Sequence, residues 1–319
     1  MAVLGPYGIT LQVPNIEPGV QYYSQAGLQA KVDDNIAHIS CYAGAHECIT
    51  LLGGTARKRL HHLSLRADPA LFDEVRRAVP AQGGRLIDAP DGFAADGLWL
   101  EDPHGLCIHL VEAPCENELA SPEPFSINAP GRVVRKNRPA MSAKAKTADV
   151  RPVRLGHVLL FSPDVPRSVR FFSEALGMGL ADRAQDVIAF MCALHGSDHH
   201  VVAFAKSPGI GFHHASFLVP TPDDVGRGGR RLSQLAKRGH WGFGRHTIGS
   251  NFFHYIQDPW GSWFEYYSDI DYIADYAEWS PTNYGIEDSL DNWGPDLPQD
   301  FVHNYEVDAS AYGATEQSA

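Results

Sequence analysis

Three residues in the second half of the chain have types and spacings that suit a metal centre. His157, His214 and Glu265 lie 57 and 51 residues apart, and each falls in or beside a short apolar run typical of a strand. Two imidazoles and one carboxylate on separate strands can converge on one face of a divalent ion and leave its other coordination positions open. This donor set suits non-haem Fe(II) and reactions with dioxygen.

Each of these residues also has a simpler interpretation. A single His in an apolar strand is often a hydrogen-bonded core residue, and Glu265, between Phe264 and Tyr266, can lie on the exposed face of an edge strand. A buried carboxylate without a partner is costly, however, and a metal ion supplies the missing positive charge. The metal interpretation therefore depends on the three residues occurring together at matching places in a sequence repeat.

The chain contains such a repeat. Three segments recur in the same order with separations of 148, 152 and 156 residues. They are residues 7–13 with 155–161, residues 60–65 with 212–217, and residues 98–105 with 254–261. Because the order is kept and the separations drift only slightly, one duplication with short insertions explains the pattern. Each half is then a module of ordinary domain size.

The repeat predicts four regions. We expect a degenerate module without a catalytic metal at 1–115, a connector rich in Pro, Ser, Ala and Lys at 116–150, a catalytic metal-binding module at 151–270, and a C-terminal arm at 271–319. The arm is rich in Tyr, Trp, Pro and Asp. It can either cover the mouth of a site or pack on the exterior of the sheet.

Within the second module, the hydrophobic pattern predicts alternating strands and helices. Strands are expected at 156–161, 187–194, 201–205 and 212–219, helices at 165–176 and from Pro222, and a hairpin of 252–257 with 262–267. Each module then consists of two βαβββ units, which gives an α+β fold.

Alternation along a strand decides which of two adjacent histidines can face a site. In the strand at 212–219, one face carries His213 with three apolar side chains, and the other carries His214 and Ser216. The apolar face should pack under the helices, so His214 rather than His213 is expected on the concave side of the sheet. In the hairpin, Tyr255 should lie near Glu265 across the ladder.

The first half lacks one of the candidate ligands. In the repeat, Ile9, His62 and His109 match the three candidates of the second half in order. Ile9 cannot bind a metal, so we expect the first module to serve as scaffold. His62 and His109 are kept as a weaker second candidate site.

Composition excludes several classes of function. The 319 residues are 44% hydrophobic and 20% charged, with a net charge of −12. The basic residues at 132–146 alternate with Pro, Ser and Ala, so they indicate a solvated connector and no nucleic-acid partner. Neither a transmembrane helix nor a signal peptide is expected. The cysteines, without a Cys-x-x-Cys motif, predict reduced thiols in a cytoplasmic protein: Cys41, Cys48, Cys107, Cys115 and Cys192.

Five separated motifs in the second half carry a family resemblance. They are Leu155-Gly-His157, His199-His-Val-Val-Ala-Phe204, Phe212-His-His214, Arg245-His246-Thr and Tyr255…Asp258-Pro…Glu265. These motifs resemble those of the type I extradiol, or meta-cleaving, catechol dioxygenases of the vicinal oxygen chelate superfamily. A two-module chain with a degenerate first half fits the same family, so the resemblance covers nearly the whole chain.

The resemblance implies a fold, a site and partners. The fold would be two tandem modules of paired βαβββ units, each forming an open, barrel-like mixed sheet of the glyoxalase type. The three candidate ligands would hold Fe(II), although the same ligands accept Mn(II). His200 would lie beside the oxygen site, and His246 and Tyr255 would contact the substrate oxygens. The partners would be a small aromatic diol and O2, and family members are commonly homo-oligomers.

The implied reaction opens an aromatic diol beside its hydroxyl groups in aromatic compound degradation. Simple, alkyl-, aryl- and carboxylate-bearing catechols and triols all stay open as substrates. Two other functions compete with this one. A glyoxalase- or epimerase-type metal isomerase on the same fold would use four protein ligands, and a non-catalytic protein that sequesters small molecules would lack the metal triad.

Overall fold

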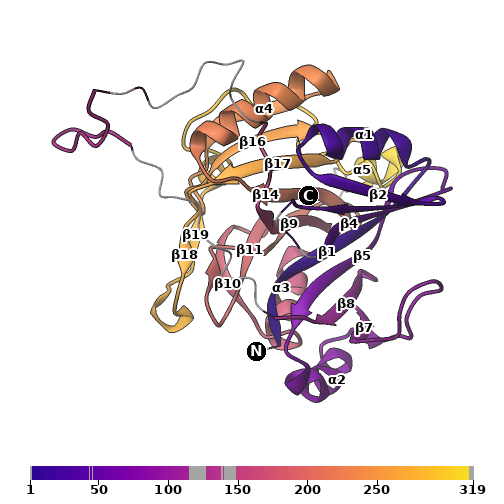
Figure 1. Cartoon of the computed structure of the whole chain (residues 1–319). Coiled ribbons are helices and arrows are strands. Elements are labelled where there is room, and N and C mark those ends of the chain that lie inside the picture. The colour runs from indigo at the N-terminus through magenta and orange to yellow at the C-terminus, as the bar shows by residue number, and fades with distance from the viewer. Residues whose placement is uncertain are drawn as a thin grey trace.

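The computed structural model describes residues 2–42, 44, 46–114, 127–137, 139 and 149–315. Within these residues the strands assemble into an eight-stranded sheet from the first half and a nine-stranded sheet from the second. Figure 1 shows the two sheets side by side, and their central strands β1 and β9 contact each other. Residue 115 and most of the expected connector, including the basic positions 138, 144 and 146, lie outside the described residues.

The first sheet has the strand order β2-β3-β4-β1-β5-β8-β7-β6. Its elements, in chain order, are β1 (Val3–Val13), α1 (Glu17–Gln25), β2 (Gln29–Asp33), β3 (Ile36–Ser40), β4 (Glu47–Gly53), β5 (Arg59–Ala67), α2 (Phe72–Ala81), β6 (Arg85–Leu86), β7 (Leu98–Glu101) and β8 (Cys107–Glu112). The chain thus runs through a βαβββ unit twice.

The second sheet has the order β15-β16-β17-β14-β9-β13-β11-β10-β19, which repeats the first sheet and adds β19 at one edge. Its elements, with the short β12–β18 pair, are β9 (Arg154–Ser162), α3 (Val165–Glu174), β10 (Met178–Ala184), β11 (Ile188–Ala193), β12 (Ser197–Asp198), β13 (Val202–Lys206), β14 (Gly211–Leu218), α4 (Pro222–Ala236), β15 (His240–Arg245), β16 (Phe252–Gln257), β17 (Trp263–Ser268), β18 (Tyr272–Ile273), β19 (Thr282–Tyr284) and α5 (Ala309–Thr315). The predicted α+β fold of tandem βαβββ modules is confirmed.

Strand register corrects one match in the repeat. His157 pairs with Ser216 across β9 and β14, and the equivalent pair across β1 and β5 is Gly8 with Ser64. The residue that matches His157 is therefore Gly8 and not Ile9. The shared glycine misled the sequence comparison, because Gly156 is skipped in the ladder by a bulge whereas Gly8 is paired. Gly8 offers no side chain, so the first module still lacks this ligand.

The core lies between the sheets and their helices. Because side chains alternate along each strand, the core and the candidate site lie on opposite faces of the second sheet. In β9, Val158 and Leu160 belong to the large core cluster that includes Phe172 of α3. Leu159 and Phe161 point to the other face and belong to a smaller cluster there. The face away from the helices is the concave side of the sheet, and it carries the candidate site.

Helix α4 lies over β16 and β17 (Figure 1) and packs unusually close to the sheet. A Cβ atom on Gly229 would lie 2.0 Å from Nδ1 of His254, so only glycine fits there. His254 on β16 is 5% exposed, and neither of its ring nitrogens has a hydrogen-bond partner among the described residues. This imidazole therefore lies in the helix-side core without a hydrogen-bond partner in the part of the chain that the structure describes, and burial there favours its neutral form over its charged form.

His254 should make stability fall in acid. Burial, with a smaller contribution from the nearby His240, lowers the pKa of His254 to about 4 from an ordinary value of 6.5. The unfolded chain therefore binds a proton at this histidine below about pH 6.5, whereas the folded chain binds it only near pH 4. The free energy of unfolding therefore has its full value above about pH 6.5 and decreases as the pH falls from about 6.5 to about 4. At about 1.4 kcal/mol per pH unit, the complete loss is roughly 3 kcal/mol. Urea unfolding at pH 8 and pH 5 should show a smaller decrease in the free energy of unfolding for His254→Leu than for the wild type. An equal decrease in both proteins would contradict this account.

The C-terminal arm joins both modules. β18 pairs with β12, and β19 extends the second sheet beside β10. Glu306 accepts hydrogen bonds from the backbone N–H groups of Leu60 and Phe212, and it forms a buried ion pair with Lys58 at 2.8 Å. The arm is therefore anchored where β5 and β14 begin, and its path crosses the concave side of the second sheet.

Two further expectations concern the chain as a whole. Within the described ranges no disulfide joins the cysteines Cys41, Cys48, Cys107 and Cys192. A helix long and apolar enough to cross a membrane is likewise not found in the part of the chain that the structure describes.

Candidate metal centre

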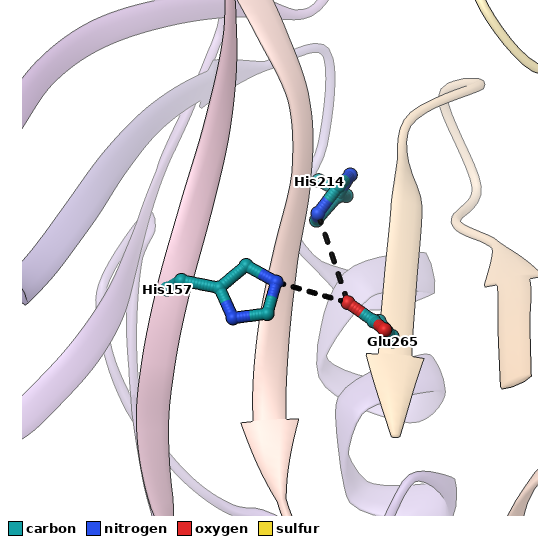
Figure 2. Close-up of side chains that lie close together, drawn as sticks. All are labelled: His157, His214 and Glu265. Atoms are coloured by element: carbon teal, nitrogen blue, oxygen red, sulfur yellow. Dashed lines mark hydrogen bonds and ion pairs between the residues drawn. The ribbon is translucent and has the colours of Figure 1, made fainter. Parts of the chain in front are cut away.

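The three candidate ligands come from three neighbouring strands and point to one place, as Figure 2 shows. His157 on β9, His214 on β14 and Glu265 on β17 are each at most 3% exposed. Nε2 of His157 lies 3.1 Å from Oε2 of Glu265, and Nε2 of His214 lies 3.7 Å from the same oxygen. In the described part of the chain, this is the only group of three potential ligands whose donor atoms all lie within 4.8 Å.

Two ring nitrogens of this group, Nδ1 of His157 and Nε2 of His214, are buried without a hydrogen-bond partner among the described residues, and only the second faces Glu265. Nε2 of His214 is buried and makes no hydrogen bond among the described residues. Its other nitrogen, Nδ1, lies 2.6 Å from Nδ1 of His213, and Nε2 of His213 lies 2.7 Å from the carbonyl oxygen of Phe301. Because the carbonyl only accepts, His213 donates to it and accepts from His214. The lone pair of His214 is thereby left on Nε2, as a metal ligand requires.

The expected orientation of His213 is wrong. Its ring contacts Phe161 and Phe301, which lie in the concave-side clusters, and not the helix-side core. The reason is a bulge: the β9–β14 register skips from Phe212 to His214, so His213 is displaced from the regular alternation. Both histidines therefore lie on the site side, where His213 supports its neighbour.

Glu265 is completely buried and held by several donors. Ser216 donates to Oε2, and Nδ2 of Asn251 lies 3.1 Å from Oε1. Burial alone would raise the pKa of Glu265, but hydrogen bonds from His157 and His246 hold it well below the ordinary value. Burial also lowers the pKa of His214 well below 6.5. The group therefore offers an anionic carboxylate and a neutral imidazole, which fit a divalent cation.

His200 lies against the ligands in the same pocket. Its ring centroid is 4.2 Å from that of His157 and 4.8 Å from that of Phe190. Burial lowers its pKa well below 6.5, and the nearby rings of His157 and His199 lower it further. A neutral imidazole at this position can accept a proton from a bound substrate.

His246 and Tyr255 stand on the other side of the group. Tyr255 on β16 pairs directly with Glu265 on β17, as expected, and its hydroxyl lies 3.0 Å from Nε2 of His246. Nδ1 of His246 donates to the carbonyl oxygen of Leu290. Burial, and then the Glu265 carboxylate, raise the pKa of Tyr255 well above 10, so its hydroxyl keeps its proton as a donor.

The pocket that these residues share is small and mostly apolar. Its volume is about 40 Å³. Besides the histidines and Tyr255, the walls are Leu159, Ile188, Phe190, Trp241, Ile248, Ser289, Leu290 and Phe301. Since Ser289, Leu290 and Phe301 come from the C-terminal arm, the arm covers the site and does not merely pack outside it. No Lys or Arg among the described residues lines the pocket.

Sequence reasoning missed several members of the site. The walls Trp241, Leu290 and Phe301 carried no signal, because an aromatic or apolar residue looks like any other core residue in the sequence. Asn251 was missed because a single Asn between two elements looks like an ordinary loop residue. His213 and His199 were visible as the first members of His-His pairs, and the repeated pairing was the signal that could have identified them.

The first module has a related cavity without the ligand set. Its volume is about 620 Å³, and Gly8, His62 and His109 line it at the positions that match the triad. Nε2 of His62 lies 3.3 Å from Oγ1 of Thr10, and Nε2 of His109 lies 2.9 Å from the carbonyl oxygen of Asp96. Both imidazoles thus have protein partners, which supports the expectation that this module serves as scaffold.

Comparison with known proteins agrees with this geometry. Residues 154–266 match the model of the glyoxalase/bleomycin resistance protein/dioxygenase superfamily. The chain is 38% identical over 301 residues to metapyrocatechase 2 of Cupriavidus necator, covering 93% of this chain and 91% of that protein.

Two solved structures share the fold over nearly the whole chain. A Mn(II)-bound glyoxalase from Novosphingobium aromaticivorans has a TM-score of 0.74 at 23% identity and covers 95% of each chain. Homoprotocatechuate 2,3-dioxygenase from Brevibacterium fuscum, in complex with 3,4-dihydroxyphenylacetate, also has a TM-score of 0.74 at 23% identity, covering 94% of this chain and 91% of that one.

Proposed function

The chain belongs to the extradiol catechol dioxygenases of this superfamily, and we propose that it cleaves small uncharged catechols with O2 at Fe(II) held by His157, His214 and Glu265. The observation that carries the metal assignment is the buried Nε2 of His214, which makes no hydrogen bond among the described residues and lies 3.7 Å from Oε2 of Glu265. The sequestering and isomerase alternatives are set aside because the 38% identical relative is a metapyrocatechase.

The metal supplies what the side chains lack. A bound Fe(II) would offer coordination positions to both reactants and would lower the pKa of the first phenol group of the diol. The same ligands would accept Mn(II), so the choice of Fe(II) is part of the proposal.

The surrounding residues would move protons and hold the ring. His200, which is neutral, would accept a proton from the diol as it binds. Tyr255, whose hydroxyl keeps its proton, would donate a hydrogen bond to a substrate oxygen as negative charge develops there. His246 would be held beside it by the Leu290 carbonyl and would orient the ring. Burial under the C-terminal arm excludes water from these steps.

The pocket chemistry predicts which diols react. The pocket is mostly apolar, and no Lys or Arg among the described residues lines it. A carboxylate on the substrate would therefore be buried without a cationic partner, which is strongly unfavourable. With iron-loaded protein, catechol and methylcatechols should show oxygen uptake and a yellow ring-opened product. Protocatechuate-type acids should react at least about 100-fold less efficiently, which corresponds to about 2.7 kcal/mol.

The same panel separates the parts of the proposal. Absence of oxygen uptake with every diol would contradict the proposed function. Efficient cleavage of the acids would contradict only the substrate class. A cytoplasmic location and a homo-oligomeric assembly, both expected from the sequence, stay predictions.

A further inference from the structure

A buried chain of hydrogen bonds reaches His200 from behind the pocket. Oδ2 of Asp182 on β10 lies 2.8 Å from Nε2 of His199, and Nδ1 of His199 lies 3.0 Å from Nδ1 of His200. The three residues are 3%, 0% and 4% exposed, respectively. The backbone N–H of Thr282 on β19 donates to the other carboxylate oxygen of Asp182 at 2.6 Å.

Donor and acceptor rules place the ring protons in this chain. A carboxylate only accepts, so Nε2 of His199 carries a hydrogen and donates it to Asp182. A neutral imidazole carries one ring hydrogen, and with that hydrogen on Nε2 the Nδ1 of His199 has a lone pair. The hydrogen between the two rings then belongs to Nδ1 of His200. Nε2 of His200, the atom left without a hydrogen, is the one available to the pocket.

We infer that Asp182 and His199 are positioning residues that hold His200 in the Nδ1–H tautomer, so that its Nε2 can accept a proton from the diol. This inference rests on the proposed function for the role of the proton, but the tautomer itself is a property of the resting protein. An imidazole in the opposite tautomer would present an N–H to the pocket and could not act as the acceptor.

The same arrangement occurs a second time in the site, with a different anchor. His213 and His214 also meet through their Nδ1 atoms, and the carbonyl of Phe301 takes the place of the Asp182 carboxylate. In both pairs the first histidine contacts an acceptor that cannot donate, and the second exposes Nε2 toward the pocket. In these two pairs the first histidine therefore fixes the tautomer of the second.

Asp182→Asn is the substitution that separates tautomer control from packing. Thr282 N–H still needs an acceptor, so the amide would keep its oxygen on Thr282 and turn its NH2 toward His199. Nε2 of His199 would then have to accept, and its hydrogen would move to Nδ1. Nδ1 of His200 would become the acceptor, which forces the hydrogen of His200 onto Nε2. This single isosteric substitution would therefore invert the tautomer of His200, which is two hydrogen bonds away from residue 182.

Nitrogen NMR reads the tautomer directly. Metal-free protein labelled with ¹⁵N-histidine is measured at pH 8 by long-range ¹H–¹⁵N correlation, with His200→Gln used to assign the His200 ring. The wild type should show Nδ1–H and Asp182→Asn should show Nε2–H at His200. A wild-type ring with Nε2–H, or the same tautomer in both proteins, overturns the inference. If Asp182→Asn does not fold, His199→Phe should leave His200 as a mixture of tautomers, and an unchanged Nδ1–H ring there overturns it equally.

Turnover provides the functional half of the test. Iron-loaded Asp182→Asn should keep its metal content and its KM for catechol while kcat falls about 100-fold, the usual contribution of a proton acceptor. Asp258→Asn is the matched control, since Asp258 is similarly buried but, among the described residues, accepts hydrogen bonds only from the backbone N–H groups of Trp260 and Ser262. It should leave both kcat and the His200 tautomer unchanged. An inverted tautomer with unchanged kcat would show that the acceptor role is wrong while the positioning is right, whereas an inactive wild type would contradict the proposed function alone.

Discussion

His214→Ala is expected to lose metal binding and turnover together. The substitution removes a ring nitrogen that faces Glu265 and makes no hydrogen bond among the described residues, and of the imidazoles beside Oε2 of Glu265 it leaves only that of His157. Loss of a supporting contact around a metal ligand already weakens affinity by about 10- to 100-fold, so loss of a ligand should exceed about 100-fold. Elemental analysis after dialysis should find about one metal ion per wild-type chain and essentially none in the variant.

The first module supplies a matched control for this experiment. His62 occupies the position that corresponds to His214, is 3% exposed and bonds to Thr10. His62→Ala should lower stability by roughly 1–3 kcal/mol through the unsatisfied partner, and it should leave metal content and turnover unchanged. Two tightly bound metal ions in the wild type, one of them lost in His62→Ala, would refute the assignment of the first module as scaffold.

Tyr255→Phe is expected to keep the metal and lose most of the turnover. The ring would retain its packing against Trp241 and Phe301, but the only hydroxyl beside both His246 and Glu265 in the described part of the chain would be gone. If that hydroxyl stabilises charge on a substrate oxygen, kcat should fall by about 100-fold or more. Because the pKa of Tyr255 is raised well above 10, the wild type should show no loss of activity from its ionisation below pH 10.

Tyr266→Phe is the control for removing a buried phenol. Tyr266 is on the same hairpin but faces the helix side, where its hydroxyl donates to the carbonyl of Ala26 at 2.7 Å. Its removal should cost about 1 kcal/mol of stability and leave kcat within about twofold. Equal turnover in Tyr255→Phe and the wild type, at equal metal content, would exclude the proposed role of Tyr255.

The sequence predicted the parts of the site that follow from regular strands. His214 and Ser216 share a face because alternate residues of β14 do, and Tyr255 faces Glu265 because the hairpin is regular from Phe252 onward. The positions that the sequence analysis placed wrongly lie where the strand pairing is irregular. A bulge turns His213 toward the site, and a second bulge makes Gly8, and not Ile9, the match of His157. A glycine such as Gly156 is a local signal for a bulge, but which residue is skipped depends on the whole ladder.

The groups that hold the site histidines in place were beyond sequence reasoning for a different reason. Asp182 is 17 residues from His199 and lies on a strand with no obvious pattern, so only the folded sheet brings them together. Leu290 and Phe301 act through backbone carbonyls, which every residue possesses. Contacts of this kind depend on the path of the chain and not on residue type.

Those two carbonyls also limit, by their positions in the chain, when the site can be completed during synthesis. They hold the rings of His246 and His213, yet they belong to residues that the ribosome adds well after the last strand of the catalytic sheet hairpin, β17. A nascent chain that ends before Phe301 would present its imidazoles with unfixed ring protons. Under the proposed function, the complete metal site would therefore form only after Phe301 has been added, and a truncated chain would be the form most open to binding zinc in place of iron.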